Sequence, residues 1–549
     1  MKVGKLILCV TILMAMFTGL AAAQAPGMGQ PQVPMPKSLD EALASIYVGD
    51  VSGLIENAGN LAGKFKPGMS GPGLKAMAGM MVQDAGLQGF SEPGSGLMVY
   101  AFNGPVFIAY AEVGAGQIQN YKMALEQQGM GAQVAGDMLA VAMPPNAIST
   151  AATLAPTARA ALADPRGAKS TLKIMGYPNK AIAAFGPQLQ GMLQMMAQPG
   201  DELNPIMQMT LLKALADSSE TSLELDLDPA NMNIQTICKA MPNTPLATYV
   251  DSPVSTNPEL MSMLPTDGAI RSVFSMNSEA YVRAAKAYAQ KAFEELDTPA
   301  DLQKDFMELY VEPSEMYEGE MNTAINMFVP GKGMLSGASI TSIKDAEKGI
   351  TIMEKTVENL KNNQAIKSME AQGLKMDVEF HKNIRSHKGT QIHQWKMKME
   401  STQNPQQMDQ LQEMLGSMEY EMSIVGDMMV VAMGDVAIEP LIDAAKTKSH
   451  PGAKALSSID AFGKGQDAYA DIDMGAFMKV VANSVGSMMG PGGNNPINAF
   501  AESLQGSAPM VMTASARESS LMAVVNVPPA LIDAMGKAVQ KMQQQGGEM

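Results

Sequence analysis

The chain has 549 residues and a formal net charge of −16, because 55 acidic side chains outnumber 39 lysines and arginines. An acidic chain repels phosphate backbones and anionic lipids, which argues against nucleic acid as a partner and against adsorption to a membrane surface. A chain of this length can bury one or two full hydrophobic cores.

The first residues have the pattern of a secretory signal peptide. Two lysines precede an apolar run over 6–20, and small residues follow it. The run is shorter than the roughly 20 residues that a membrane span needs. We expect cleavage after Ala23 or Ala25, a flexible proline- and glycine-rich leader over 26–36, and a periplasmic or secreted protein. No later stretch is apolar enough to predict a transmembrane segment.

The predicted mature chain keeps a single cysteine. Removing residues 1–25 removes two lysines and no acidic residue, so the formal charge changes from −16 to −18. Cys238 then has no intramolecular disulfide partner. Its neighbours in 234–241 recur at helical spacing, and no histidine lies in this half of the chain. We expect a buried, inert thiol rather than a nucleophile.

One eight-residue segment occurs twice. The first copy, at 136–143, reads Gly-Asp-Met-Leu-Ala-Val-Ala-Met, and the second, at 426–433, reads Gly-Asp-Met-Met-Val-Val-Ala-Met. In each, a Gly-Asp turn leads into a continuous apolar run, which is typical of a buried strand. We therefore predict that one structural unit is present in two copies.

Each copy is predicted to begin with a short strand and a helix. The strand lies within 36–50 in the first copy and within 265–277 in the second. The helices, at 51–65 and 278–296, each start at a small polar cap.

The second copy is predicted to carry an insertion. Its Gly-Asp turn lies 290 residues after that of the first copy, whereas the two copies begin 229 residues apart. The extra residues fall at about 297–400 and predict an acidic helix, a helix over 345–362, and a hairpin over 374–399 that turns at 387–390.

After the Gly-Asp-Met strand, each copy is predicted to continue with a helix, a strand and another helix. The strand and second helix are expected at 181–185 and 188–196 in the first copy, and at 467–473 and 474–485 in the second. Each copy is then predicted to close with a hairpin and a proline-started helix. The hairpin strands are expected at 206–216 and 222–229 in the first copy, and at 509–516 and 520–528 in the second. Residues 211–216 alone have a helical composition, but their position favours a strand.

The predicted fold class is α+β, with two copies of an antiparallel sheet covered by helices and a helix-plus-hairpin insertion in the second. The predicted domains are a signal peptide (1–25), a leader (26–36), a first repeat (37–252), a polar linker (253–264), a second repeat (265–543) and a tail (544–549).

The second copy carries a series of motifs: the glycine-started strand at 426–433, a helix at 438–445, a Leu-Ser-Ser loop within 455–458 and a tyrosine-containing strand at 469–473. This series resembles an uncharacterised bacterial extracytoplasmic domain family, a domain of unknown function found in large exported proteins. The resemblance covers most of the second copy and is fainter in the first. It implies an exported α+β domain and brings no catalytic residues.

Three histidines in the predicted hairpin, His381, His387 and His393, recur every six residues, a spacing that raises a metal site as an alternative. A hairpin centred on the Lys-Gly pair at 388–389 would pair His393 with Ile384 and His381 with Lys396. His381 and His393 would then lie on opposite faces. Basic side chains surround them, so we expect solvated histidines and no metal site.

Methionine is unusually frequent, with 52 residues. Clusters at 192–196 and 207–209 contain thioethers, which are soft ligands for Cu(I). Because the enrichment extends along the whole chain, adaptable core packing is the favoured interpretation.

Other candidate sites are weaker. In the acidic run at 294–320, Asp301, Asp305, Glu308 and Glu312 share one helical face without a calcium-loop pattern, which favours a solvated surface. The acid pairs at 226 and 228 and at 471 and 473 each flank an apolar residue. Ser170 and Lys173 match S-x-x-K, but no K-T-G follows.

The sequence therefore predicts no catalytic, cofactor-binding or metal-binding residues. The first hypothesis is a non-catalytic exported binding or scaffold protein whose partner is a protein or cell-envelope component. The alternatives are a periplasmic carrier of an apolar ligand or copper and a carboxylate-dependent hydrolase.

Overall fold

The computed structural model describes residues 35–546 except 67, 85, 91–94, 105, 163–170, 197–202, 229, 317–318, 330–333, 344, 363–369, 371–372, 402–417 and 490–495. The predicted signal peptide and most of the predicted leader lie outside these residues. Helices and antiparallel strands are mixed throughout, as the α+β prediction requires. The chain forms two compact units: unit 1 holds residues up to 184 with 219–238, and unit 2 holds 185–218 with the residues from 239 onward.

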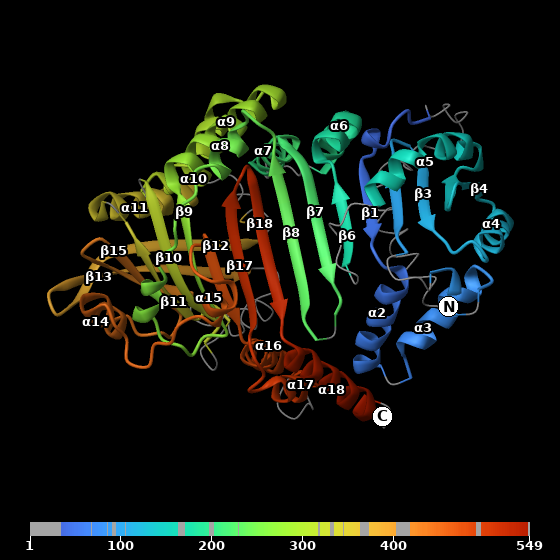
Figure 1. Ribbon diagram of the computed structural model, residues 1–549. Coiled ribbons are helices and arrows are strands. Elements are labelled where there is room, and N and C mark those ends of the chain that lie inside the picture. Colours follow the sequence, from blue (N-terminus) through green and yellow to red (C-terminus); the bar gives the residue numbers. More distant parts are fainter. Residues whose placement is uncertain are drawn as a thin grey trace. The chain divides into compact units, whose positions relative to one another are not determined.

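Unit 1 contains an antiparallel sheet (Figure 1). Its strands pair in the order β7–β6–β1–β2–β3–β5–β4, and β8 lies beside β7. The strands are β1 Ala44–Val48, β2 Leu97–Ala101, β3 Phe107–Glu112, β4 Gly131–Ala135, β5 Met138–Met143, β6 Thr171–Gly176, β7 Ser218–Asp226 and β8 Met232–Ala240.

Side chains from helices cover both faces of this sheet. On one face, small residues of α5, including Ala151 and Ala155, pack with Met138 and Ala140 of β5. On the other face, Leu139 of β5 joins a second core with α2, α3 and α4. The helices are α2 Val51–Phe65, α3 Gly71–Met81, α4 Ile118–Gln127, α5 Ile148–Leu162 and the start of α6 Pro178–Met196, which continues into unit 2, with short 3₁₀ helices η1 Leu39–Glu41, η2 Gln88–Phe90 and η3 Pro145–Ala147. Burial on both faces explains why β5 is a continuous apolar run.

Unit 2 contains a longer antiparallel sheet. Its strands pair in the order β18–β17–β16–β9–β10–β11–β15–β14–β13–β12. The strands are β9 Ile270–Asn277, β10 Glu320–Met327, β11 Gly337–Ser342, β12 Leu374–His387, β13 Thr390–Ser401, β14 Glu419–Val425, β15 Met428–Met433, β16 Ala468–Ile472, β17 Met510–Arg517 and β18 Ser520–Val527.

Helices of unit 2 lie at both ends of its strands and on the faces of its sheet. In Figure 1, α7 to α10 lie at the top and α16 to α18 at the bottom. The helices are α7 Leu203–Ala216, α8 Pro245–Val250, α9 Ser278–Leu296, α10 Ala300–Tyr310, α11 Ala346–Asn362, α14 Glu439–Thr447, α15 Ser457–Phe462, α16 Met474–Met489, α17 Pro496–Leu504 and α18 Pro529–Gly546, with η4 Pro258–Met263 and η5 Glu312–Met316.

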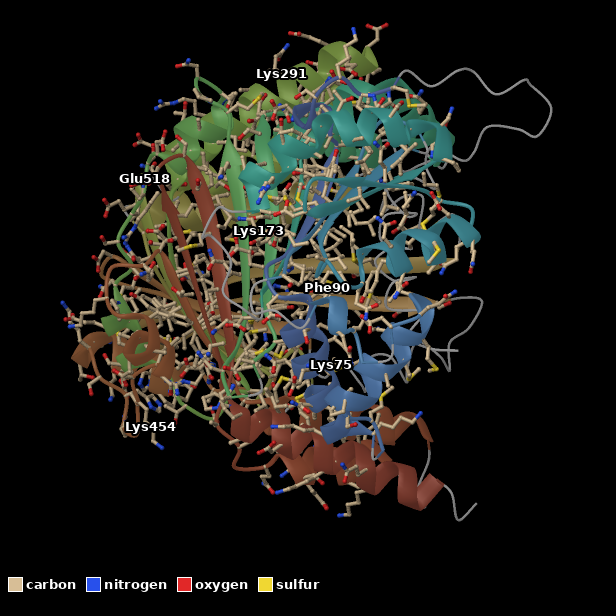
Figure 2. The ribbon with its side chains drawn as sticks, turned by 45° about the vertical axis from the view of Figure 1, so that its right-hand side comes forward. Lys75, Phe90, Lys173, Lys291, Lys454 and Glu518 are labelled. Atoms are coloured by element: carbon tan, nitrogen blue, oxygen red, sulfur yellow. The ribbon has the colours of Figure 1, made fainter. Side chains whose placement is uncertain are left out.

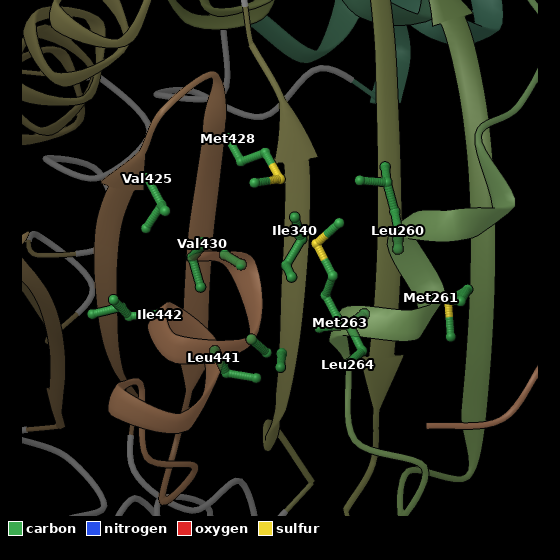
Figure 3. Close-up of a cluster of buried hydrophobic side chains, with 14 of the residues drawn as sticks. Leu260, Met261, Met263, Leu264, Ile340, Val425, Met428, Val430, Leu441 and Ile442 are labelled. Atoms are coloured by element: carbon green, nitrogen blue, oxygen red, sulfur yellow. The ribbon is translucent and has the colours of Figure 1, made fainter. Parts of the chain in front are cut away.

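The largest core of unit 2 lies between the sheet, α14 and η4 (Figure 3). Ile340 of β11 and Val430 of β15 are fully buried there against Leu441 and Ile442 of α14. Burial of an aliphatic side chain of this size stabilises the fold by about 1.5–3 kcal/mol. Residues 253–264, expected to form a polar linker, include η4 and Leu264, whose apolar side chains belong to this core.

Several expected elements are present. The strands and helices that open the two predicted copies are β1 with α2 and β9 with α9. Side chains of Asp50 and Asn277 cap the two helices by accepting hydrogen bonds from Gly53 and Ala280 backbone N–H groups at 2.8 and 3.0 Å. The predicted helix at 345–362 is α11, and the predicted hairpin is β12–β13.

The two Gly-Asp turns have the same local structure. In each, a two-residue loop joins antiparallel strands, β4 to β5 and β14 to β15. Gly136 has φ +69° and Gly426 has φ +63°. Glycine in the first loop position with positive φ is the pattern of a type II′ hairpin turn. Both turns then lead into the expected buried strand.

The end of the first predicted copy differs from expectation. Residues 181–185 belong to helix α6, and the strand before it is β6. Residues 206–216 lie in helix α7 rather than in a strand. A short apolar run fits either a strand or a buried helix, and only the elements packed around it decide between them.

The closing strands of that copy also differ. The strand expected at 222–229 is part of β7, which is followed by a second strand, β8, and not by a proline-started helix. Cys238 lies on β8 and not on a helix, and its side chain is partly exposed rather than buried. Residues 232–235 alternate between apolar and polar side chains, which was the signal for this strand.

Replacement of either turn glycine by alanine should destabilise its unit. Gly136→Ala and Gly426→Ala each force a side chain into a left-handed conformation, with an expected loss of about 1–2 kcal/mol. The cost should be equal at the two sites, because neither added Cβ meets an atom within 4 Å. Urea unfolding measures it, by circular dichroism for Gly136→Ala and by Trp395 fluorescence for Gly426→Ala.

Gly191→Ala on α6 is the control, because its Cβ also meets open space without a positive φ. This substitution should raise stability, by up to about 1 kcal/mol. Equal destabilisation by all three variants would contradict the turn assignment.

Candidate functional site

The β12–β13 hairpin contains a bulge that the sequence did not predict. Its turn is at Lys388 and Gly389, whose φ values are +48° and +80°, as expected for a type I′ turn. Near the turn the expected register holds, with Arg385 opposite Ile392. Beyond the bulge, His381 lies opposite Gln394 and not opposite Lys396. Three residues of β12, 382–384, therefore face the single residue His393.

The three hairpin histidines have different surroundings. His381 is exposed and lies 2.8 Å from Glu379, and His387 lies 3.0 Å from Asp443. His393 is only 4% exposed, which corrects the expectation that it is solvated. His381 and His393 do lie on opposite faces. Among the described residues, no three His, Cys, Asp or Glu side chains are grouped so as to hold a metal ion.

A cavity of about 480 Å³ opens beside His393. Its walls come from the start of α11, the bulge of β12, the hairpin turn, β13 and β14. The lining residues are Ile350, Thr351, Lys382, Asn383, Gly389, Thr390, Gln391, His393 and Ile424. The cavity thus combines two aliphatic side chains with several hydrogen-bonding groups around a buried imidazole.

Packing and the bulge fix the orientation of His393. Its ring stacks on Phe380 with a centroid distance of 6.1 Å and an interplanar angle of 15°. Its Nδ1 accepts a long hydrogen bond, 3.4 Å, from the backbone N–H of Asn383, which has φ +53°. Asparagine tolerates this left-handed conformation better than most residues. If Nδ1 accepts, the proton of the neutral ring is on Nε2.

The charge state of His393 follows from its surroundings. Burial lowers its pKa below the ordinary value of 6.5 because a charged imidazolium is poorly solvated there. The Lys382 ammonium lowers the pKa further, and the Glu354 carboxylate acts in the opposite direction. Lys382 and Glu354 form an ion pair of 2.6 Å between β12 and α11. Lys382 is one of the basic side chains that the sequence places around the histidines, whereas Glu354 was not singled out, because only the fold places α11 near His393.

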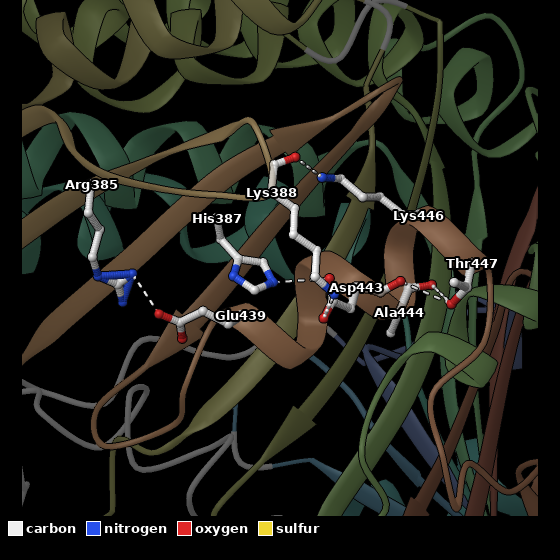
Figure 4. A network of polar contacts seen from close by, with 8 residues as sticks. All are labelled: Arg385, His387, Lys388, Glu439, Asp443, Ala444, Lys446 and Thr447. Atoms are coloured by element: carbon white, nitrogen blue, oxygen red, sulfur yellow. Dashed lines mark hydrogen bonds and ion pairs between the residues drawn. The ribbon is translucent and has the colours of Figure 1, made fainter.

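A polar network fixes the hairpin tip to α14 (Figure 4). Asp443 of α14 receives hydrogen bonds from His387 Nε2 at 3.0 Å and Lys388 Nζ at 2.7 Å. The Lys446 ammonium donates to the Lys388 carbonyl at 2.9 Å. The bond from Lys388, with a smaller contribution from His387, lowers the pKa of Asp443.

A second set of ion pairs joins the hairpin to β14 and α14. Arg385 contacts Glu421 at 2.6 Å and Glu439 at 2.9 Å. Bonds to charged groups are stronger than neutral ones. The tip of the hairpin is therefore held by several contacts to neighbouring elements.

The outer edge of β12 has a different character. Among the strands that the structure describes, β12 pairs with β13 alone. Its register is continuous over 374–381, and Lys375, Asp377 and Glu379 are exposed. On the inner face, Val378 is buried. The outer-face charges lie opposite Glu400, Lys398 and Lys396 of β13.

Other side chains considered from the sequence have structural surroundings. Lys173 on β6 (labelled in Figure 2) pairs with Glu224 at 2.6 Å, and Ser170 lies outside the described residues. Met209 is buried in the core shared by α7, α9 and α10, whereas Met207 is 38% exposed. The side chains of the cluster at 192–196 lie outside the described residues.

The acidic run is divided between two elements. Asp301, Asp305 and Glu308 lie on α10, whereas Glu312 begins η5. Glu308 lies 3.7 Å from Lys304. Asp301 is exposed, and the other three acids are partly exposed.

The motifs of the second copy form one buried polar contact. Asp471 on β16 is 5% exposed and accepts hydrogen bonds from the backbone N–H groups of Ser457 and Ser458, at 2.6 and 2.9 Å. Asp473 caps α16 through the Ala476 N–H at 2.9 Å. Asp228 likewise accepts from its own turn, at the Ala230 N–H. These acids therefore organise turns and helix starts.

Substitution of Asp471 should destabilise unit 2. In Asp471→Asn the backbone N–H of Ser457 or Ser458 loses its charged acceptor at a buried site. This loss should lower the free energy of unfolding by about 1.5–3 kcal/mol. Asp473→Asn is the matched control, since asparagine and aspartate cap helices about equally well. Urea unfolding followed through Trp395 fluorescence measures both. A loss in Asp473→Asn as large as that in Asp471→Asn would contradict this assignment.

Stability should depend on pH through His393. Its pKa is lower in the folded than in the unfolded chain, so the unfolded chain binds the extra proton first as the pH falls below 6.5. The wild-type chain should therefore lose stability between pH 7.5 and 5.5 relative to His393→Phe. Thermal melts across this range measure the difference. Parallel pH profiles for the two proteins would show that His393 is not buried as described.

Comparisons with protein-family models, with curated proteins and with solved structures give no match. No described helix combines the length and the apolar composition that crossing a membrane requires. The geometry of the β12–β13 hairpin is therefore the basis on which a function is inferred.

Proposed function

We propose that this chain is a non-catalytic exported binding protein of the bacterial cell envelope, and that the β12–β13 hairpin is its recognition element. One observation carries the proposal. The outer edge of β12 has a continuous stretch, 374–381, that is bonded on one side only among the described strands. An extended segment of a partner protein can add to such an edge as a further strand.

An exposed edge strand carries a risk of uncontrolled pairing, and proteins usually block it with bulges, charges or covering elements. The bulge at 382–384 and the exposed charges of β12 act in this way near the tip. The regular stretch before the bulge keeps its backbone groups in register for a partner. Its exposed side chains, Lys375, Asp377 and Glu379, would select a segment with complementary charges.

The anchoring of the hairpin also supports a binding role. Asp443 fixes the tip through two hydrogen bonds, and Arg385 forms two ion pairs with neighbouring elements. An edge that is already ordered loses little conformational entropy when a partner adds to it. The charged groups at the tip are thus engaged in positioning the hairpin.

We also propose that the two sets of strands, one in each unit, are copies of one ancestral unit. The order β8–β7–β6–β1–β2–β3–β5–β4 corresponds, strand for strand, to β18–β17–β16–β9–β10–β11–β15–β14. The helices between them follow the same sequence, with α6 and α7 corresponding to α16 and α17. On this alignment α10, β10 and β11 correspond to α3, β2 and β3, so they are not part of the insertion. The insertion predicted at about 297–400 is then limited to β12, β13 and the segments that connect them.

Export remains part of this proposal. It rests on the signal-like pattern of the first 25 residues and on the resemblance of the second copy to an exported domain family. A recognition hairpin present in only one of two copies would give an otherwise structural unit a specific role.

Site-specific photo-crosslinking in the native cell envelope tests the binding role. A photoreactive residue at Asp377, on the edge, should capture one partner protein. The same residue at Lys398, which lies opposite Asp377 on the inner strand β13, should not. In the isolated complex, backbone amides of 374–381 should gain protection from hydrogen exchange, because strand addition bonds them.

Equal capture from Asp377 and Lys398 would contradict recognition through the edge. Protection confined to unit 1 would do so as well, because it would place the partner away from the hairpin.

A further inference from the structure

We propose that the cavity beside His393 binds a small organic anion, such as a carboxylate that carries a short apolar group. This site is separate from the outer edge of β12 and would take a small molecule rather than a protein segment. Its volume of about 480 Å³ lies within the range of small-molecule pockets.

The lining of the cavity is suited to a ligand with one apolar and one polar end. Ile350 of α11 and Ile424 of β14 provide aliphatic walls. The bulge places Lys382 and Asn383 on the same cavity as His393. Gln391 and Thr390 add further hydrogen-bonding groups. A few polar groups that converge in a partly apolar pocket are the usual arrangement for orienting a small ligand.

His393 provides a fixed hydrogen-bond donor. Its Nδ1 is occupied by the Asn383 N–H, so Nε2 carries the proton of the neutral ring. Within the described part of the chain, Nε2 has no hydrogen-bond acceptor. Phe380 holds the ring plane by stacking. An acceptor atom of a ligand in the cavity could receive this hydrogen bond.

The local charge favours an anion over a cation. The ammonium-bearing side chain of Lys382 lines the cavity, whereas Glu354 is not among the lining residues. The chain as a whole carries a net charge of −16, so a lining whose basic groups are Lys382 and His393, without a carboxylate, is a local exception. A carboxylate in the cavity can contact the imidazole and compete with Glu354 for the ammonium of Lys382.

Benzoate is a suitable probe. Benzylamine is a cation of similar shape, and benzyl alcohol is an uncharged molecule of similar shape. We expect benzoate to shift the NMR resonances of the His393 ring in the full mature chain. The shift should saturate, with its half-maximal value at a benzoate concentration of about 1 mM. Trp395, the single tryptophan, lies two residues along the same strand and gives a second signal in fluorescence. Benzylamine should bind at least about tenfold more weakly.

The pH dependence separates a specific site from weak adsorption. Lys382 and Glu354 are the charged groups that act on His393, and an added carboxylate favours its protonated form. Benzoate should therefore bind more tightly as the pH falls from 7.5 to 5.5, and bound benzoate should raise the pKa of His393. Binding that does not change over this range would contradict contact with the ring.

Three variants test the assigned roles. Lys382→Met and His393→Phe should each weaken benzoate binding at least about fivefold, because each removes a charged or donating group. Glu354→Gln should strengthen it, because Lys382 is released from its ion pair. Lys396→Met is the matched control, since Lys396 forms a comparable pair with Glu419, 3.2 Å apart, on the opposite face of the hairpin.

Lys382→Met and Glu354→Gln alter exposed side chains, so these two results stand even if His393→Phe folds poorly. The absence of saturable binding, a preference for benzylamine, or equal weakening by Lys396→Met would each overturn the proposal. These outcomes are independent of the edge of β12, because benzoate has no backbone with which to extend the sheet.

Discussion

Burial of the central strands on both faces is the constraint on which the rest of the structure depends. In unit 1, Met138 and Ala140 of β5 face one helical layer while Leu139 faces the other. In unit 2, Val430 of β15 packs toward α14, and Met429 and Val431 pack with Ile352 of α11. A strand covered on both faces leaves little freedom in register, because a shift by one residue would exchange its two sets of contacts.

This two-sided packing also determines where the hairpin can lie. β14 pairs with β15 on one side and with β13 on the other, so the buried centre of the sheet continues into the hairpin. Ile392 is buried in the same core as Leu441 and Ile442, next to the tip that Asp443 holds. The hairpin is therefore an extension of the sheet, and its far edge is ordered by pairing with β13.

The bulge changes what this extension can do. Without it, residues 382–384 would continue the ladder and His393 would have an ordinary cross-strand neighbour. With it, the backbone N–H of Asn383 turns to the imidazole, and Lys382 reaches Glu354 on α11. Bulges commonly occur beside functional sites because they redirect side chains in this way. A single local irregularity thus creates both a cavity and the end of the regular edge.

The sequence was informative where local chemistry decided the structure. The Gly-Asp turns, the helix caps at Asp50 and Asn277, and the Lys-Gly hairpin turn all follow from short-range rules. The sequence was misleading where the secondary structure of the first copy was inferred from that of the second. The closing hairpin of the first copy was placed one element too early, because the helical composition of 211–216 was overruled by position.

His393 shows the limit of reading a site from its spacing. Alternation with Trp395, Met397 and Met399 on the same strand is the pattern of an apolar face, whereas the surrounding basic side chains led us to expect solvated histidines. Its burial, its pKa and its neighbours Lys382 and Glu354 depend on a bulge and on a helix distant in sequence.

By itself, the sequence determined the fold class, the turns and the starts of the elements, because these depend on residues within a few positions of one another. Only the tertiary structure decided which strand is an open edge, which histidine is buried and where a cavity forms, because those properties arise from pairing and packing between segments far apart in the chain.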